Sequence, residues 1–232
     1  MIDEFLGMEK LSLVDYEGKV AATLFTGGCN FRCPFCHNSS LVETPDEIEY
    51  IPFNEIMVYL QKRKGILDGV CITGGEPTLL PSLKEKIKEI KKLGYFVKLD
   101  SNGTNPQILK DLIAKRLIDY VAMDIKNSKE KYSKTIGLKN IDLDKIEQSI
   151  KILKTSGIDY EFRTTIIKGF HEKEDFEKIG KWLQGSKRYF LQHFVDKGNC
   201  IEKNLEEINE EEANKFKQIL EKYIDNVNLR GY

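Results

Sequence analysis

The sequence predicts an α/β fold of six strand-and-helix units, and two observations support this. Short runs of β-branched and aromatic residues, typical of strands, recur along the chain, and charged, amphipathic segments with helical periodicity lie between them. This alternation is typical of a parallel sheet with right-handed crossover helices. Six such units can form an open or partly closed barrel, and a doubly wound open sheet is compatible with the same pattern.

Each element follows from its local pattern. The expected strands are 20–26, 69–73, 95–101, 119–125, 159–167 and 188–194. The expected helices are 52–63, 82–93, 106–116, 142–155, 172–184 and 209–222. In the second helix Leu83, Ile87 and Ile90 fall on one face, as expected for a helix that packs against a sheet. Gly94 then ends that helix.

Composition limits the function. A chain of 232 residues suits one domain, and 41% hydrophobic content is ordinary for a globular protein. The 36 basic and 37 acidic residues leave a formal charge of −1. A partner held by bulk electrostatics would require a basic excess, so we expect neither a nucleic acid nor a membrane partner.

The N-terminus also bears on the location of the protein. MIDEFLGMEK is acidic and carries no pattern of a signal peptide, and no apolar run approaches the length of a spanning helix. We therefore expect a cytoplasmic protein in a reducing environment. There, clustered cysteines are more often metal ligands or catalytic groups than disulfides.

Four unusual motifs fall at the same edge of the predicted sheet. They are TGGCN (26–30), TGGEP (73–77), DSNG (100–103) and MDIK (123–126), and each lies at or just after the end of an expected strand. Ligands of parallel α/β folds bind at the carboxyl edge of the strands, because the strand-to-helix loops converge there. We therefore expect a single site at this edge.

Cys29, Cys33 and Cys36 have the spacing C-x3-C-x2-C and account for three of the five cysteines. Three soft thiolates suit zinc or an iron–sulfur cluster, and His37 is the fourth ligand that a closed zinc site would need. A lone nucleophile would not require three cysteines. We favour a 4Fe-4S cluster with three protein ligands, whose fourth iron is open to a small molecule.

The segment CNFRCPFC (29–36) resembles the cysteine loop of radical S-adenosylmethionine (SAM) enzymes, including Phe35 before the third cysteine. The resemblance implies a partial (β/α)6 TIM-like barrel with parallel strands and outer helices. It also implies that SAM chelates the open iron and that one electron from the cluster cleaves SAM to methionine and a 5′-deoxyadenosyl radical. Phe35 is then a candidate wall for the adenine.

The resemblance extends to the TGGEP loop. Taken alone this segment is a turn, but Gly74, Gly75, Glu76 and Pro77 match the GGEP motif of the superfamily, which receives the SAM amino group. The glycines allow the backbone to approach a ligand closely, and the glutamate is an acceptor for an ammonium group.

Similarity to radical SAM activases of glycyl-radical enzymes implies roles for the next two motifs. Ser101 and Asn102 are candidates for contact with the ribose or methionine portion of SAM. Asp124 and Lys126 would lie near the methionine carboxylate, and Asp100 with Asp124 is a candidate monovalent cation site.

Arg163 is a charged residue within a predicted strand, and a buried arginine requires an anionic partner. That partner is either the SAM carboxylate, as the activase resemblance implies, or a carboxylate of the protein. His193 loosely matches a residue near adenine in some relatives, although a core or surface histidine is the simpler interpretation. Cys71 is expected to pack as a small hydrophobe and Cys200 to be a surface-loop thiol.

The region 7–42 resembles one branch closely, the activating proteins of anaerobic ribonucleoside-triphosphate reductase. LSLVDYEGK (11–19) differs from the usual motif at Glu17, where proline is common, and NVNLRG (226–231) is similar to the end of that branch. The reaction implied is abstraction of a hydrogen atom from a backbone glycine of the reductase, which installs a glycyl radical. A flavodoxin- or ferredoxin-type protein would supply the electron.

The same resemblance divides the chain into an N-terminal extension (1–18), a barrel core (19–194) and a C-terminal helix with a terminal strand (195–232) within one radical SAM domain. Other functions are compatible with the motifs. These are an activase of another glycyl-radical enzyme of the pyruvate formate-lyase type, and a small-molecule radical SAM enzyme such as a carboxy-deazaguanine synthase. A zinc-bearing interaction module is the non-enzymatic alternative.

Overall fold

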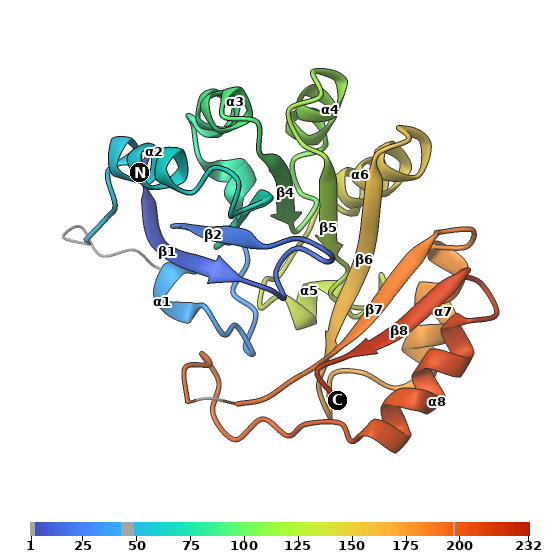
Figure 1. Ribbon diagram of the computed structural model, residues 1–232. Helices are drawn as coiled ribbons and strands as arrows, with labels where there is room; N and C mark the ends of the chain where they lie inside the picture. The colour runs from blue at the N-terminus through green and yellow to red at the C-terminus, as the bar shows by residue number, and fades with distance from the viewer. Residues whose placement is uncertain (1–2, 43–48, 197) are drawn as a thin grey trace.

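A computed structural model describes residues 3–42, 49–196 and 198–232. Its centre is one curved sheet in which eight strands follow one another in chain order (Figure 1). The strands are β1 (Phe5–Ser12), β2 (Ala21–Thr26), β3 (Gly69–Gly74), β4 (Phe96–Ser101), β5 (Tyr120–Asp124), β6 (Asp159–Ile166), β7 (Arg188–His193) and β8 (Asn226–Arg230). The six predicted strands correspond closely to β2 through β7.

The strand order establishes the type of α/β fold. The strands β2 to β8 are parallel, and only β1 at one edge runs antiparallel to its neighbour. A doubly wound sheet requires the strand order to reverse, whereas consecutive right-handed crossovers place every helix on the same side. The α/β prediction with parallel strands and outer helices is therefore confirmed, and the doubly wound alternative is wrong.

Helices follow one another around the outside of the sheet, as Figure 1 shows. The longer ones are α2 (Phe53–Lys62), α3 (Leu83–Lys92), α4 (Pro106–Ala114), α6 (Leu143–Thr155), α7 (Lys173–Trp182) and α8 (Glu210–Leu220). Short helical turns, α1 (Ser39–Val42), η1 (Pro77–Leu79) and α5 (Tyr132–Thr135), lie in the loops after the strands. In the described part of the chain, none of the helices is both long and apolar enough to cross a membrane.

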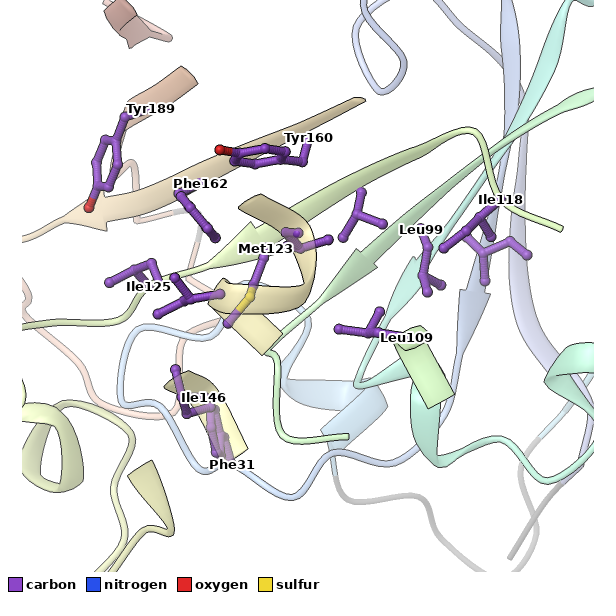
Figure 2. Packing of buried hydrophobic residues seen from close by; sticks show 14 of the residues in the cluster. Phe31, Leu99, Leu109, Ile118, Met123, Ile125, Ile146, Tyr160, Phe162 and Tyr189 are labelled. Atoms are coloured by element: carbon purple, nitrogen blue, oxygen red, sulfur yellow. The ribbon is translucent and has the colours of Figure 1, made fainter. Parts of the chain in front are cut away.

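The main hydrophobic core lies between the sheet and these helices. Figure 2 shows Leu99, Met123 and Phe162 on successive strands, with Leu109 and Ile146 from the covering helices. All five side chains are fully buried. Since side chains alternate between the two faces of a strand, the neighbouring residues point to the inner face of the sheet. The inner positions carry most of the polar residues discussed below.

The LSLVDYEGK segment closes one end of the inner face. Tyr16 packs on Tyr120 with ring centroids 5.9 Å apart, and with Ala21 and Ala122 it forms a separate small buried cluster. Asp15 accepts a hydrogen bond of 2.6 Å from the hydroxyl of Thr23. Part of the expected N-terminal extension thus belongs to the sheet as β1, and the following loop fills the space beneath the parallel strands.

The C-terminal strand is held by a buried ion pair. Arg230 of β8 donates two hydrogen bonds, of 2.7 and 3.0 Å, to the carboxylate of Glu161 on β6, and the hydroxyl of Tyr120 donates a third of 2.8 Å. Burial favours the neutral form of Glu161, but the contact with Arg230 outweighs it and lowers the pKa of this carboxyl group. The charges of Arg163 and Lys98 also lower the pKa of Glu161, and the hydrogen bond from Arg230 is the largest of these contributions.

We expect Arg230→Gln to lower the free energy of unfolding by roughly 2–3 kcal/mol, because it leaves a buried carboxylate without its cation. The control is Arg188→Gln, which removes an exposed pair with Asp159 and should cost at most about 1 kcal/mol. Urea denaturation of both variants measures the difference. An equal decrease in the free energy of unfolding for the two variants would contradict the assignment of Arg230 as the residue that holds β8.

The same pair predicts a pH dependence. Since the pKa of Glu161 is lower in the folded state, its stabilisation is fully present above its unfolded pKa of about 4.3. It is lost as the pH falls through the folded-state pKa. The stability difference between wild type and Arg230→Gln should therefore shrink on acidification below about pH 4. A difference that grows in acid would contradict this.

Candidate active site

A cavity of about 310 Å³ opens at the carboxyl ends of the strands. Every residue predicted for the site lines it: Cys29, Cys33, Phe35, Cys36, Gly74, Gly75, Glu76, Pro77, Asp100, Ser101, Asn102, Asp124, Lys126 and Arg163. These residues come from the carboxyl ends of β3, β4 and β5, from the loops after β2 to β5, and from β6. The expectation of a single site at this edge therefore agrees with their positions.

The cysteine loop places three free thiols at this cavity. Gly28 has a φ of 80°, which lets the chain turn sharply after β2, and its N–H donates a 2.7 Å hydrogen bond to the carbonyl of Leu41. Cys33 is buried, and Cys29 and Cys36 are partly exposed. The N–H of Cys36 donates to the carbonyl of Cys33 at 3.0 Å, which closes the second half of the loop into a turn.

The thiols fit a soft metal group. Burial raises the pKa of Cys29 to about 11 and that of Cys33 to about 12, so both stay protonated until a metal displaces their protons. Within the described ranges, no three His, Cys, Asp or Glu side chains are arranged to hold one metal ion. A 4Fe-4S cluster suits thiols on one cavity wall, because it offers a separate iron to each cysteine.

The TGGEP loop touches the cysteine loop directly. The N–H of Glu76 donates to the carbonyl of Gly28 at 2.8 Å, and the N–H of Gly75 donates to the carbonyl of Thr26 at 3.0 Å. A β-carbon on Gly75 would lie only 1.9 Å from the carbonyl oxygen of Gly28. Glycine is therefore required here by the contact between two loops.

The carboxylate of Glu76 is buried and faces donors of the protein. Its Oε1 accepts from the N–H and hydroxyl of Thr78 at 3.1 and 2.5 Å and from the hydroxyl of Ser101 at 2.9 Å, and Oε2 accepts from the N–H of Asn102 at 2.6 Å. Burial raises the pKa of Glu76, although these hydrogen bonds oppose the shift. In this structure the carboxylate ties the TGGEP loop to the DSNG loop, and its role as acceptor for the SAM amino group stays a prediction.

A second polar link joins the DSNG loop to the cysteine loop. The side-chain amide of Asn102 donates to Asn30 at 2.8 Å, and the amide of Asn30 donates to the hydroxyl of Thr104 at 2.9 Å. Sequence analysis missed Asn30 and Thr104. The position of Asn30 immediately after the first cysteine was the available signal, but nothing in the sequence indicated its partner.

Five side chains form a line of alternating charge across the inner face of the sheet. Lys98 contacts Asp100 at 2.6 Å, and Asp100 contacts Arg163 at 3.0 Å. Arg163 also contacts Asp124 at 2.5 Å, and Asp124 contacts Lys126 at 2.7 Å. In this structure the partners of Arg163 are therefore carboxylates of the protein, and its contact with the SAM carboxylate stays a prediction.

The ion pairs hold these groups charged despite burial. Burial would raise the pKa of Asp124, but the charges of Arg163 and Lys126 lower it well below its usual range. Burial would likewise lower the pKa of Lys126, and the charge of Asp124 raises it. Three cations and two anions leave this line with one unit of net positive charge.

Further residues line the cavity. Phe35 packs edge-on against Phe170 at 5.8 Å between ring centroids. Thr165 and Gln192, on neighbouring strands, were missed by sequence analysis, although both lie near the ends of expected strands. His193 also lines the cavity, with Nε2 3.0 Å from the carboxylate of Glu207, so it is neither a core residue nor a simple surface histidine.

The remaining cysteines have different surroundings. Cys71 is fully buried, as expected, with its sulfur 3.8 Å from the amine of Lys98. The prediction of a surface-loop thiol at Cys200 is wrong, because this residue is only 4% exposed. The N–H of Glu202 donates to the carbonyl of Pro34 at 2.9 Å, and this contact holds the loop around Cys200 against the cysteine loop.

Comparison with known proteins identifies the family. Residues 23–183 match the family model of the radical SAM superfamily. The chain belongs to the radical SAM superfamily. It is 35% identical, over 97% of its own length and 94% of the relative's, to a putative glycyl-radical enzyme activating enzyme, MJ1227, of Methanocaldococcus jannaschii. It is 29% identical to the pyruvate formate-lyase-activating enzyme of Staphylococcus epidermidis, over 76% of this chain and 73% of that one.

Comparison with a solved structure supports the fold. The chain is similar to SuiB of Streptococcus suis, determined with bound S-adenosylmethionine, with a TM-score of 0.69 and 15% identity. The match covers 90% of this chain and 52% of SuiB, so the chain spans about half the length of that protein. Membership of the superfamily implies a 4Fe-4S cluster and SAM as cofactors, and the three free thiols on one cavity wall fit the cluster.

Replacing Cys29, Cys33 or Cys36 with Ala should abolish cluster assembly, because each removes one of only three thiolates of the loop. Cys200→Ala, a buried cysteine outside the motif, is the matched control and should assemble a normal cluster. Iron and sulfide content after anaerobic reconstitution measures the outcome. A full cluster in any of the three variants contradicts the ligand assignment.

Replacing Glu76 with Ala should lower both the free energy of unfolding, by roughly 2–4 kcal/mol, and SAM affinity, since four hydrogen bonds to a buried carboxylate are lost. Urea denaturation and anaerobic SAM binding report the two effects. Weaker SAM binding with unchanged stability would instead indicate direct contact between the carboxylate and SAM.

Proposed function

We propose that this protein is a radical SAM activase that installs a glycyl radical on anaerobic ribonucleoside-triphosphate reductase. The observation that carries the proposal is the cavity that combines three free thiols, the TGGEP loop and a buried line of charges with a positive excess. Similarity over nearly the whole chain to a putative glycyl-radical enzyme activating enzyme supports the reaction class. The LSLVDYEGK and CNFRCPFCHN segments support the reductase as target.

In this proposal the residues of the cavity hold and orient the cofactors. Cys29, Cys33 and Cys36 would hold a 4Fe-4S cluster through three of its irons, and the fourth iron would have no protein ligand. When bound, the cluster and SAM supply reductive cleavage of the sulfonium and a 5′-deoxyadenosyl radical. Phe35, buried beside the third cysteine, would exclude water from the cluster and serve as a wall for the adenine of SAM.

The remaining predicted residues position SAM. Lys126 and Arg163 provide positive charge for the methionine carboxylate, and the surplus unit of charge on their line is available for it. Glu76 acts through the position of the TGGEP loop, and Ser101 and Asn102 support that position by their hydrogen bonds to it.

The substrate in this proposal is a protein. Hydrogen abstraction from glycine is favoured because no side chain shields the α-hydrogen, and both flanking amides stabilise the product radical. A cytoplasmic flavodoxin- or ferredoxin-type donor would reduce the cluster.

A second target is favoured by one specific observation. Identity of 29% with the pyruvate formate-lyase-activating enzyme of Staphylococcus epidermidis over three quarters of the chain is compatible with a lyase as partner. The chemistry at the cavity would be the same, and the docking surface alone would differ.

The reconstituted protein should be incubated anaerobically with SAM and a reductant, together with either the reductase or a pyruvate formate-lyase. We expect a glycyl EPR signal with the reductase and little with the lyase. If the reductase carries α-deuterated glycine, deuterium should appear in 5′-deoxyadenosine. A glycyl signal with the lyase alone supports the second target. Cleavage of SAM without a protein radical on either the reductase or the lyase contradicts the activase proposal.

A further inference from the structure

The buried carboxylates of Asp100 and Asp124 are the pair that resemblance to the activases offers to a monovalent cation. We infer that in this protein the guanidinium group of Arg163 occupies the position between them, so that SAM binds without Na⁺ or K⁺. This inference rests on the SAM site of the proposed function, but not on the glycyl-radical target.

All four carboxylate oxygens already contact a cation of the protein. For Asp100, Oδ1 lies 2.6 Å from the amine of Lys98 and Oδ2 lies 3.0 Å from Arg163. For Asp124, Oδ1 lies 2.5 Å from Arg163 and Oδ2 lies 2.7 Å from the amine of Lys126. A metal ion that bridges the two aspartates between their facing oxygens would compete with Arg163, which joins those two oxygens. The residues therefore do not fit a cation in this arrangement.

Charge argues in the same direction. The line already carries three cations and two anions, so that in the absence of SAM a bound Na⁺ or K⁺ would raise its net charge from one to two units. Like charges repel more strongly at a partly buried site than in water, because the effective dielectric constant is lower. Asp100 and Arg163 are both nearly buried, with side chains 11% and 13% exposed. An added cation would therefore be disfavoured unless Arg163 left its position.

The sheet itself fixes the arginine. Arg163 of β6 is the direct cross-strand partner of Asp124 on β5. On the other side of β5, Asp100 of β4 pairs with Ala122 of β5. Asp100, Asp124 and Arg163 thus lie on three neighbouring strands, and all three line the cavity. Strand register places the guanidinium group between the carboxylates, so the arrangement does not depend on a mobile loop.

The first test uses the unmodified protein. SAM affinity of the anaerobically reconstituted enzyme should be measured in potassium, sodium and choline salts at equal ionic strength. We expect the three dissociation constants to agree within about twofold, less than 0.5 kcal/mol. A tenfold gain in affinity with K⁺ or Na⁺ would overturn the inference, because it would show that a metal ion displaces Arg163.

The second test compares two variants with the same loss of charge. Arg163→Gln frees the two oxygens between the aspartates, whereas Lys98→Gln removes one positive charge but leaves Arg163 in place. Binding of Tl⁺, a mimic of K⁺, is followed by thallium NMR in nitrate buffer. We expect Tl⁺ to bind to Arg163→Gln and to neither wild type nor Lys98→Gln.

Each outcome of the thallium experiment either supports or contradicts the inference about Arg163. Tl⁺ bound to wild type, or absent from a folded Arg163→Gln protein, would contradict the view that the arginine stands in a cation position. If Arg163→Gln does not fold, the SAM affinities of the wild type still decide the inference. Tl⁺ binding requires neither SAM cleavage nor a partner protein. The result of this experiment therefore stands even if the glycyl-radical proposal fails.

Discussion

The site depends on close contact between the backbones of two loops. The carbonyl of Gly28, just before the first cysteine, accepts a hydrogen bond from Glu76 and lies where any side chain on Gly75 would collide with it. This contact fixes the cysteine loop relative to the TGGEP loop. The buried carboxylate of Glu76 then extends the connection to the DSNG loop. Three loops from successive strands thereby become one rigid wall of the cavity.

The two faces of the sheet divide stability and function between them. Apolar residues on the outer face pack against the helices and form the main core. The inner face carries ion pairs, from Glu161 and Arg230 to the line that ends at Lys126. Partly buried charges are costly unless they are paired, and pairing along neighbouring strands satisfies them. The inner face can therefore present charge to a ligand without exposing a large polar surface.

Much of this could be predicted from the sequence, because the relevant signals are local. Hydrophobic periodicity located six of the seven parallel strands and six long helices, and strand ends located the residues of the cavity. Pairing across distance could not be predicted. The partners of Arg163, the donors around Glu76 and the burial of Cys200 all depend on residues far away in the chain. The edge strand β1 was missed because antiparallel pairing, not a strong local pattern, defines it.

The central claim is that three cysteines hold an iron–sulfur cluster whose open iron binds SAM in this cavity. Electron–nuclear double resonance of the reduced, reconstituted protein with SAM isotopically labelled at its amino nitrogen and carboxylate oxygen tests this directly. The account predicts hyperfine coupling of both labels to the cluster. A cluster without coupling to either label, or a protein that takes up zinc and forms no cluster, would contradict it.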